Sequence, residues 1–586
     1  MSFIDRRSFL KGTAAVSAAA IAGCKSTNKR HHQPHLAPST QPEEEVGGGL
    51  GVEERFAPTS GREKEFVRVL LHEADGSPLD DSRARLLYAR DMHNDTIPVA
   101  VHLAQGRARV GIPDEPIQLC GRLKVPGFGE VYCYADNNGR GYTKPETIEF
   151  VVAAAQTRLR RVTEAAESAR SMGVGLDPEL ERRLALARRP FLNEQGSARI
   201  AAAYESLSNS LHAGERIVTN AAKLKISRLQ QPRKDFYFGA MVSGWDAHGE
   251  AFQKPFREAF NFSTGAWYHW KDPHDPKDPV DYTRMDASIN WLLSQKITPK
   301  GFGYLYMARG ATAGWIRPID TAGTNPATIP FDPRPKGPVD PKRQYNPDWP
   351  YDKIKNLYAQ VIENTVCRYD GKLPYAEIMN EAHDKANLWR LSHEQILDMG
   401  KMAFDAARRG SKTVKRQMNH CCLWGEYAKD RNPDGSRRWT PYRFIKDCFA
   451  SGIDYEVIGL QLYYPQFDLF EIDRMLERFT VFNKPIHITE LATASQPGLD
   501  ASSMRPKTEA PGWHEQWNET TQADWLEGVY TLLYSKPLYQ AAGWWDFTDR
   551  PGHFWPFGGL LRPDMTPKPA YDRLRKLQKD WGVSRV

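Results

Sequence analysis

Short apolar segments alternate with longer amphipathic ones through residues 235–582. Each short segment leads into a polar loop and then into apolar residues at helical spacing, which is typical of a strand–loop–helix repeat. The eight candidate strands lie at 236–242, 260–267, 301–307, 375–380, 416–421, 457–463, 486–490 and 542–547. This repeat predicts an α/β fold, a (β/α)8 TIM barrel whose functional side chains lie at the carboxyl ends of the strands.

The pattern changes twice before the barrel. Residues 61–144 alternate apolar and polar positions in short runs between Gly, Asp and Asn turns, which predicts a small β-sandwich. Residues 145–230 have apolar positions at helical spacing, with Arg and Glu on the other face. The sequence Asp177-Pro178-Glu179 is a strong helix-start signal in this region. We expect a helical spacer there.

The first residues predict export. Arg6 and Arg7 belong to a twin-arginine signal, and the apolar run that follows is too short to span a membrane. The run ends at Cys24 in a sequence that resembles a lipoprotein cleavage box, so residues 1–24 are predicted to be a signal with a lipidated cysteine. The alternative is an ordinary export signal with an incidental cysteine. Residues 25–60 are predicted to be a flexible linker.

These features predict a protein of the periplasm, the outer membrane or the cell surface, held to the membrane only by its lipid. A net charge of +7 is mild for 586 residues, and no dense basic run is interleaved with aromatics, so we expect no nucleic-acid partner. No Cys or His spacing is typical of a metal site, and we expect no metal, no other cofactor and a monomer. Cys120 and Cys133 could form a disulfide in an oxidising compartment.

Two predicted strands end in a glutamate. The segment 375–381 ends in Asn380 and Glu381, and the segment 486–490 ends in Glu490. Carboxyl groups at two strand ends of a barrel would meet at its mouth. Such a pair suggests glycoside hydrolysis, in which one carboxyl protonates the leaving oxygen and the other attacks the sugar.

An ordered set of motifs around these strands resembles glycoside hydrolase family 10, the retaining endo-β-1,4-xylanases. Met379-Asn380-Glu381-Ala382 is similar to the acid/base strand of that family, and Ile486-His487-Ile488-Thr489-Glu490-Leu491 is similar to its nucleophile strand. Further matches, in the family's order, are 260–264 with 268–270, 458–463, 522–523, 545–549 and 568–571. The resemblance covers residues 235–580. It implies a double displacement that needs no metal.

Several positions depart from the family's motifs. The family has Glu, Asn and Lys where this chain has Ala266, Trp267 and His269, and it has His and Trp where this chain has Phe302 and Tyr306. Tyr463 and Ala492 replace a further His and Asp. The sugar that the site would bind is therefore open between xylan and another polysaccharide.

The resemblance implies that Glu490 is the nucleophile and Glu381 the acid/base. Tyr463 would donate a hydrogen bond to Glu490, and Asn380 would bind the sugar 2-hydroxyl. Trp545 would form the pocket floor, unless it is a buried core residue. Arg309 would bind an acidic sugar or form an ordinary salt bridge. The other candidate substrate-binding residues are Asn261, His269, Tyr306 and Gln461.

Further expectations concern side chains around this pair. Glu377 should face the barrel interior with Arg416 as its cation, and His487 should pack outward against the covering helices. Four tryptophans lie on predicted loops of the active face, where at least one should be a sugar platform: Trp315, Trp513, Trp517 and Trp555.

We therefore predict an exported, retaining β-glycoside hydrolase that acts on xylan or a related polysaccharide. One alternative is the same chemistry on an acidic or branched polysaccharide. The other is a surface sugar-binding protein without catalysis, which the changed recognition positions would allow.

Overall fold

The computed structural model describes residues 65–585, except 176, 272–276, 309, 318–347, 385, 433–434, 504–511 and 515–516. Cys24, the predicted signal, the linker at 25–60 and Arg309 lie outside the described residues. Among the helices that are described, none combines the length and the apolar character that a membrane span requires.

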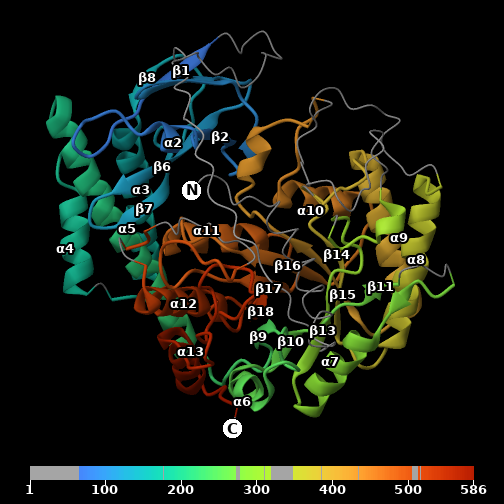
Figure 1. Cartoon of the computed structure of the whole chain (residues 1–586). Coiled ribbons are helices and arrows are strands. Elements are labelled where there is room, and N and C mark those ends of the chain that lie inside the picture. Colours follow the sequence, from blue (N-terminus) through green and yellow to red (C-terminus); the bar gives the residue numbers. More distant parts are fainter. Residues whose placement is uncertain are drawn as a thin grey trace, which may run out of the picture.

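Eight parallel strands close into a barrel in the second half of the chain (Figure 1). They are β9 (Tyr237–Met241), β10 (Phe262–Thr264), β13 (Thr298–Gly301), β14 (Tyr375–Asn380), β15 (Lys415–His420), β16 (Val457–Leu462), β17 (Ile486–Leu491) and β18 (Tyr539–Trp544). β18 pairs with β9 and closes the sheet. The predicted (β/α)8 barrel is confirmed.

The third strand differs from its predicted bounds. β13 lies at Thr298–Gly301, whereas the sequence pattern predicted 301–307. Gly303 has a φ of +57°, a left-handed conformation that interrupts the extended chain. Pairing with β14 resumes beyond this kink, where Leu305 bridges to Met379. Beyond the kink, the backbone N–H groups of Tyr304 and Leu305 donate to the carbonyls of Glu377 and Ile378 on β14, at 3.1 and 2.8 Å, and Lys300 lies in the strand proper.

Helices cover the outside of the barrel. They are α6 (Gly249–Ala259), α7 (Thr283–Ser294), α8 (Tyr351–Arg368), α9 (His393–Gly410), α10 (Pro441–Ala450), α11 (Leu469–Thr480), α12 (Glu519–Tyr534) and α13 (Pro569–Asp580). Side-chain caps fix several starts: Ser392 and Gln395 form a capping box on α9, and Asp468 caps α11. A short hairpin of β11 (His269–Trp270) and β12 (Val280–Asp281) follows β10, and two single-turn helices, η1 (Gly314–Ile316) and η3 (Glu426–Lys429), lie in loops.

Two four-stranded sheets precede the barrel. One has the order β4 (Val101–Ala104), β5 (Arg107–Gly111), β1 (Phe66–Leu70) and β8 (Thr147–Glu149); the other has β3 (Thr96–Ile97), β2 (Tyr88–Asp91), β6 (Ile117–Val125) and β7 (Gly129–Ala135). Between β1 and β2 lies the short helix α2 (Asp81–Ala84). Cys120 and Cys133 are both free, because the register pairs Cys120 with Tyr134 and Gly121 with Cys133. Neighbouring side chains on a strand point to opposite faces, so the suggested disulfide is wrong.

The helical region consists of α3 (Phe150–Ser171), α4 (Pro178–Ala187) and α5 (Gly196–Ser227). Asp177 caps α4 by accepting a hydrogen bond from the backbone N–H of Leu180. The three helices lie along one side of the barrel, where α5 packs against α11 and α12 (Figure 1). A buried ion pair between Arg158 of α3 and Asp468 at the start of α11 joins the two parts.

The lower interior of the barrel is an apolar plug. Phe262, Tyr375, Val457, Ala541 and Tyr237, from five strands, form this cluster. The ring of His487 lies against Phe262 and Tyr375, at centroid distances of 5.8 and 4.8 Å. Since β10 and β17 are not neighbours, His487 must point into the barrel, and the expected outward orientation is wrong. Burial lowers the pKa of His487 to about 3, so the ring is neutral in this plug.

Candidate active site

Glu381 and Glu490 meet above the plug, at the carboxyl ends of β14 and β17. Both are buried, with exposed fractions of 2% and 0%. One amide joins them: Gln461 Nε2, from β16, donates to Oε1 of Glu381 at 2.8 Å and to Oε1 of Glu490 at 2.8 Å. Glu381 has a φ of +53°, which is costly for a residue with a Cβ and is typical of positions that a functional site constrains.

The two carboxyl groups have different hydrogen-bond partners. Besides Gln461, Glu490 accepts from Asn419 Nδ2 at 3.1 Å and from the Tyr463 hydroxyl at 2.9 Å, the contact that the sequence analysis expected. Glu381 accepts from the Tyr306 hydroxyl at 3.2 Å. Donors stabilise the ionised form of a carboxyl group. The three donors therefore stabilise a negative charge on Glu490.

The environment also limits the total charge of the pair. Burial raises the pKa of Glu490 well above its usual range, and the charges of Glu381 and Glu377 raise it further, whereas Tyr463 and Lys300 oppose this shift. Two buried carboxyl groups this close cannot both ionise easily. The pair therefore favours one negative charge and one proton.

A second polar layer lies below the two glutamates, nearer the amino ends of the strands. Lys300 Nζ pairs with Glu377 Oε2 at 2.6 Å and donates to Gln417 Oε1 at 3.2 Å. The expected partner, Arg416, instead pairs with Glu456 on the outside of the barrel. The register places Glu377 beside Gln417, so Arg416, one residue earlier, must face the other way.

Asn380 has one satisfied and one open group. Its Oδ1 accepts from Asn419 Nδ2 at 3.1 Å, whereas its Nδ2, fully buried, has no hydrogen-bond partner among the described residues. A buried donor without an acceptor is costly unless a ligand supplies one. Asn419, which holds both Asn380 and Glu490, is a site residue that the sequence analysis missed; it lies on a predicted strand, but no motif marked it.

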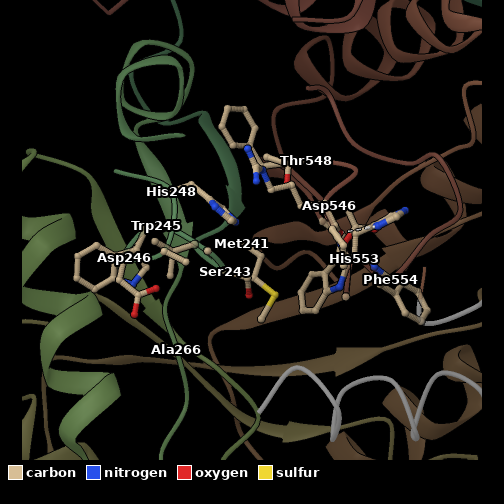
Figure 2. A pocket seen from close by; sticks show the side chains of 18 of the residues that line it. Met241, Ser243, Trp245, Asp246, His248, Ala266, Asp546, Thr548, His553 and Phe554 are labelled. Carbon is tan, nitrogen blue, oxygen red and sulfur yellow. Dashed lines mark hydrogen bonds between the residues drawn. The ribbon is translucent and has the colours of Figure 1, made fainter. Parts of the chain in front are cut away.

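A cavity of about 390 Å³ opens at the carboxyl ends of β9, β10 and β18, and neither Glu381 nor Glu490 lines it. Trp545 and His269, both predicted site residues, line it. Figure 2 shows Asp246 and His248 on one side of this cavity and Asp546, His553 and Phe554 on the other. Phe554 packs edge-on against Tyr463, at 5.5 Å between ring centroids, so the cavity wall touches the donor of Glu490.

Cationic and polar groups face this cavity. The lining includes Arg284, Arg550, His248 and His269. Arg284 lies 3.3 Å from Asp246, whereas Arg550 has no ion pair among the described residues, and its buried Nε has no acceptor there. Burial and the charge of Arg550 lower the pKa of His248, and burial and Arg284 lower that of His269. Both histidines are therefore neutral near pH 7, and the arginines carry the positive charge.

One predicted site residue lies elsewhere. Asn261 precedes β10 at the amino end of the barrel, where its Oδ1 accepts from the backbone N–H of Phe238 at 2.8 Å. It is a structural cap far along the strand from the carboxyl ends, and its assignment to substrate binding is wrong. A residue at the start of a barrel strand lies at the opposite end from the carboxyl pair, so the motif match alone misled this assignment.

The loop tryptophans are mostly structural. Trp513 is buried, and its Nε1 donates to Glu215 of α5 at 2.9 Å. Trp517 is also buried, and Trp315 packs against Trp349 and Trp270. Trp555 is buried beneath the site, where it stacks on Tyr463. None of these four lines the cavity described above, and the sugar platform among them stays a prediction.

Comparisons with known proteins agree with this architecture. The model of glycosyl hydrolase family 10 matches residues 229–577, and a model of the twin-arginine signal sequence matches residues 4–23. Endo-1,4-beta-xylanase B of Neocallimastix patriciarum is 26% identical over 176 residues, which are 27% of this chain. The match spans 19% of that relative's length.

Solved xylanase structures align with the barrel region. Xylanase 10B from Thermotoga petrophila RKU-1, in complex with xylobiose, has 18% identity and a TM-score of 0.42, over 62% of this chain and 97% of that one. Native xylanase 10B from Thermotoga maritima has 19% identity and a TM-score of 0.42, over 62% and 98%.

The family match spans more than half of the chain and coincides with the barrel that holds the carboxyl pair, and it defines a glycoside hydrolase. The chain belongs to glycosyl hydrolase family 10, as its motifs suggested. Its first residues are a twin-arginine export signal.

Proposed function

We propose that the protein hydrolyses β-glycosidic bonds in xylan or a closely related polysaccharide, with retention of configuration. The bridge through Gln461 carries this proposal. Because its Nε2 lies 2.8 Å from an oxygen of each glutamate, those oxygens are at most twice that distance apart. Retaining enzymes have carboxyl groups about 5–5.5 Å apart, whereas inverting enzymes need about 6.5–9.5 Å.

The hydrogen bonds support a division of roles. Glu490, with three donors, is the ionised nucleophile that attacks the anomeric carbon; Glu381 gives its proton to the leaving oxygen. A covalent glycosyl–enzyme intermediate forms as the glycosidic bond breaks. Glu381 then takes a proton from water, the water oxygen attacks the anomeric carbon, and Glu490 leaves. The open Nδ2 of Asn380 supports a hydrogen bond to the sugar 2-hydroxyl.

Two observations support a xylan-like polymer outside the cytoplasm. The relatives named above are xylanases. The export signal directs the protein out of the cytoplasm, where a polysaccharide substrate would be found. Lipidation of Cys24 and residence in the periplasm or at the outer surface complete this proposal.

The test follows xylan hydrolysis by the exported chain. The wild type should release reducing sugar, and the first product seen by proton NMR should be the β-anomer. Glu490→Ala should reduce kcat by at least about 10,000-fold, because no covalent intermediate can form. An initial α-anomer, or near-normal turnover in the variant, would overturn the mechanism. Polymer binding without hydrolysis by the wild type would instead support the sugar-binding alternative.

The cavity favours a second candidate substrate. Arg550 presents a guanidinium without a carboxylate partner among the described residues, beside a wall that touches Tyr463. Guanidinium groups bind carboxylates by paired hydrogen bonds. A polysaccharide with uronic-acid substituents would supply such a group. Initial rates on uronate-substituted and unsubstituted xylan, compared at equal backbone concentration, distinguish the two candidates.

A further inference from the structure

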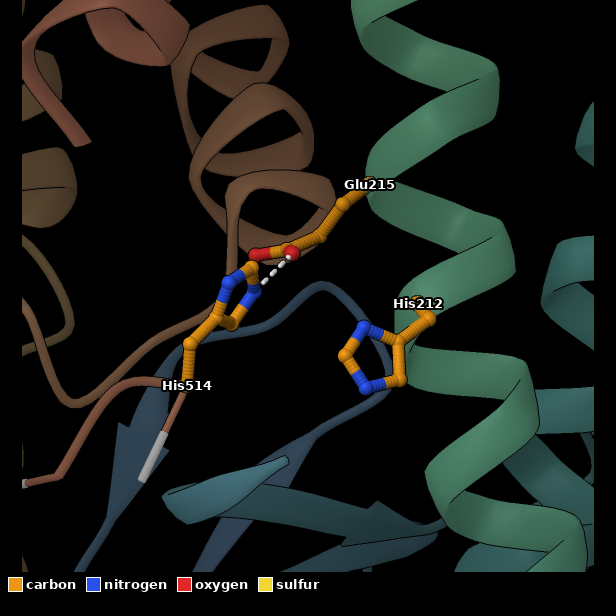
Figure 3. A group of neighbouring side chains, drawn as sticks. All are labelled: His212, Glu215 and His514. Atoms are coloured by element: carbon orange, nitrogen blue, oxygen red, sulfur yellow. Dashed lines mark hydrogen bonds and ion pairs between the residues drawn. The ribbon is translucent and has the colours of Figure 1, made fainter. Parts of the chain in front are cut away.

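Three potential metal ligands outside the carboxyl pair and its hydrogen-bond partners meet where α5 contacts the barrel (Figure 3). His212 and Glu215 are three residues apart on α5 and therefore share one face of the helix. His514 comes from the segment between β17 and α12. One ligand atom from each of the three lies within 4.8 Å of the others.

His212 is oriented as a metal-binding histidine. Its Nε2 lies 2.7 Å from the backbone carbonyl of Gly127. A carbonyl only accepts, so Nε2 carries the proton and Nδ1 keeps its lone pair. Metal-bound histidines commonly donate their other N–H to a carbonyl in this way. Burial lowers the pKa of His212, which also keeps the ring neutral.

Glu215 is held equally firmly. Its Oε1 accepts from the backbone N–H of Leu469 and from Trp513 Nε1, both at 2.9 Å. Its Oε2 faces His514 Nε2 at 2.7 Å, where a proton now joins the two groups. A cation can take the place of that proton. An ion pair alone would explain the contact between Glu215 and His514. It would not explain why the Nδ1 lone pair of His212 lies beside them.

We propose that His212, Glu215 and His514 bind one divalent ion of the Zn²⁺ class. Two imidazoles and one carboxylate suit Zn²⁺ better than Mg²⁺ or Ca²⁺, which prefer oxygen ligands. Zinc bonds of about 2.0–2.2 Å place tetrahedral ligand atoms roughly 3.3 Å apart, so the rings must move inward. His514, whose side chain is 37% exposed, and the half-buried His212 lie at the rim, where such a shift is possible.

The ion would connect two parts of the chain. Gly129 of β7 forms a bridge with Trp513, whose ring stacks on His514 at 3.8 Å, so residues 512–514 already join the barrel to the N-terminal sheets. A shared ligand set would fix α5 to this same segment. The expected role is structural, because neither carboxyl group of the active site is involved.

The test measures Zn²⁺ binding to the full exported chain after metal removal by a chelator. Calorimetry should find one more site in the wild type than in His212→Gln, with Zn²⁺ affinity at this site reduced more than about 100-fold in the variant. Gln can still donate to Gly127, so the fold should survive. His514→Ala should lose the same site, and His93→Ala, on an exposed loop, should keep it.

Thermal unfolding gives a second readout. Zn²⁺ should raise the melting temperature of the wild type and of His93→Ala, but not of the two ligand variants. Xylan hydrolysis should be unchanged in all of them, so the result does not depend on the proposed function. Equal zinc stoichiometry in the wild type and His212→Gln, or binding through the His-containing segment 25–60 alone, would overturn the proposal.

Discussion

The two sides of the barrel mouth differ in how completely their polar groups are paired. On the side of β14 to β17, Gln461 joins both glutamates, and Asn419 and Tyr463 also donate to Glu490, in one network of hydrogen bonds between 2.8 and 3.1 Å. On the side of β9, β10 and β18, the lining of the cavity includes an arginine without a carboxylate partner among the described residues.

The paired side holds the two glutamates of the proposed reaction, and the cavity side is where we expect the substrate to be recognised. The paired side keeps both glutamates and Gln461 of the family's motifs, although Tyr306 and Tyr463 are departures there too. The cavity side holds the departures Ala266, Trp267 and His269. The buried hydrogen bonds around Glu490 tolerate little change, because each substitution leaves a partner unpaired. Residues that line a cavity can be replaced at a lower cost in stability. Polar groups that are left unpaired there can then bind a different ligand.

Replacing the general acid, Glu381, should reduce activity more than the other substitutions considered below. Glu381→Ala should lower kcat/KM on xylan by about 100- to 10,000-fold, since the leaving oxygen departs unprotonated. Aryl glycosides with good leaving groups need less protonation and should lose much less activity in the first step. Steady-state rates on both substrates check this. Equal losses on both would exclude an acid role for Glu381.

The layer beneath the glutamates should control stability. Lys300→Met leaves Glu377 buried without its cation, and breaking a buried pair costs about 3–5 kcal/mol. Chemical unfolding followed by tryptophan fluorescence measures the change in free energy. The double variant Lys300→Met/Glu377→Leu is the control, and it should recover most of the loss. A single variant as stable as the wild type would mean that Glu377 is already protonated.

The sequence motifs predicted the glutamates and their Tyr463 contact because these residues lie on strands with clear apolar alternation. Lys300 was not predicted as a site residue, because the predicted third strand began one residue after it, and Asn261 was misjudged because it lies at the amino end of β10. An apolar run cannot distinguish strand from kinked loop, and Gly303 shifted the third strand toward the amino end. Almost the whole barrel sequence separates His514 from His212 and Glu215, so no local spacing could group the three.

On the cavity side, Arg550→Ala should reduce kcat/KM on uronate-substituted xylan by about 10- to 100-fold, the value of one hydrogen bond between charged groups. Unsubstituted xylan should be hydrolysed as by the wild type. Arg257→Ala, which removes a surface arginine paired with Glu250 on α6, is the matched control. A similar loss on both polymers would show that Arg550 supports the fold of the cavity and does not select the substrate.

The smallest expected effect lies where the two sides meet, at Tyr463. Its hydroxyl donates to Glu490 and lowers the pKa of that carboxyl group, against the raising effects of burial and of Glu381. Tyr463→Phe removes this donor, so the pKa of Glu490 should rise. Because the nucleophile must be ionised, the acidic limb of the profile of kcat/KM against pH should move to higher pH, with the alkaline limb nearly unchanged. Tyr464→Phe, at the neighbouring position, is the control. An unshifted acidic limb with a uniformly lower rate would mean that Tyr463 acts through its stacking on Trp555, as part of the cavity wall, and not through the charge of Glu490.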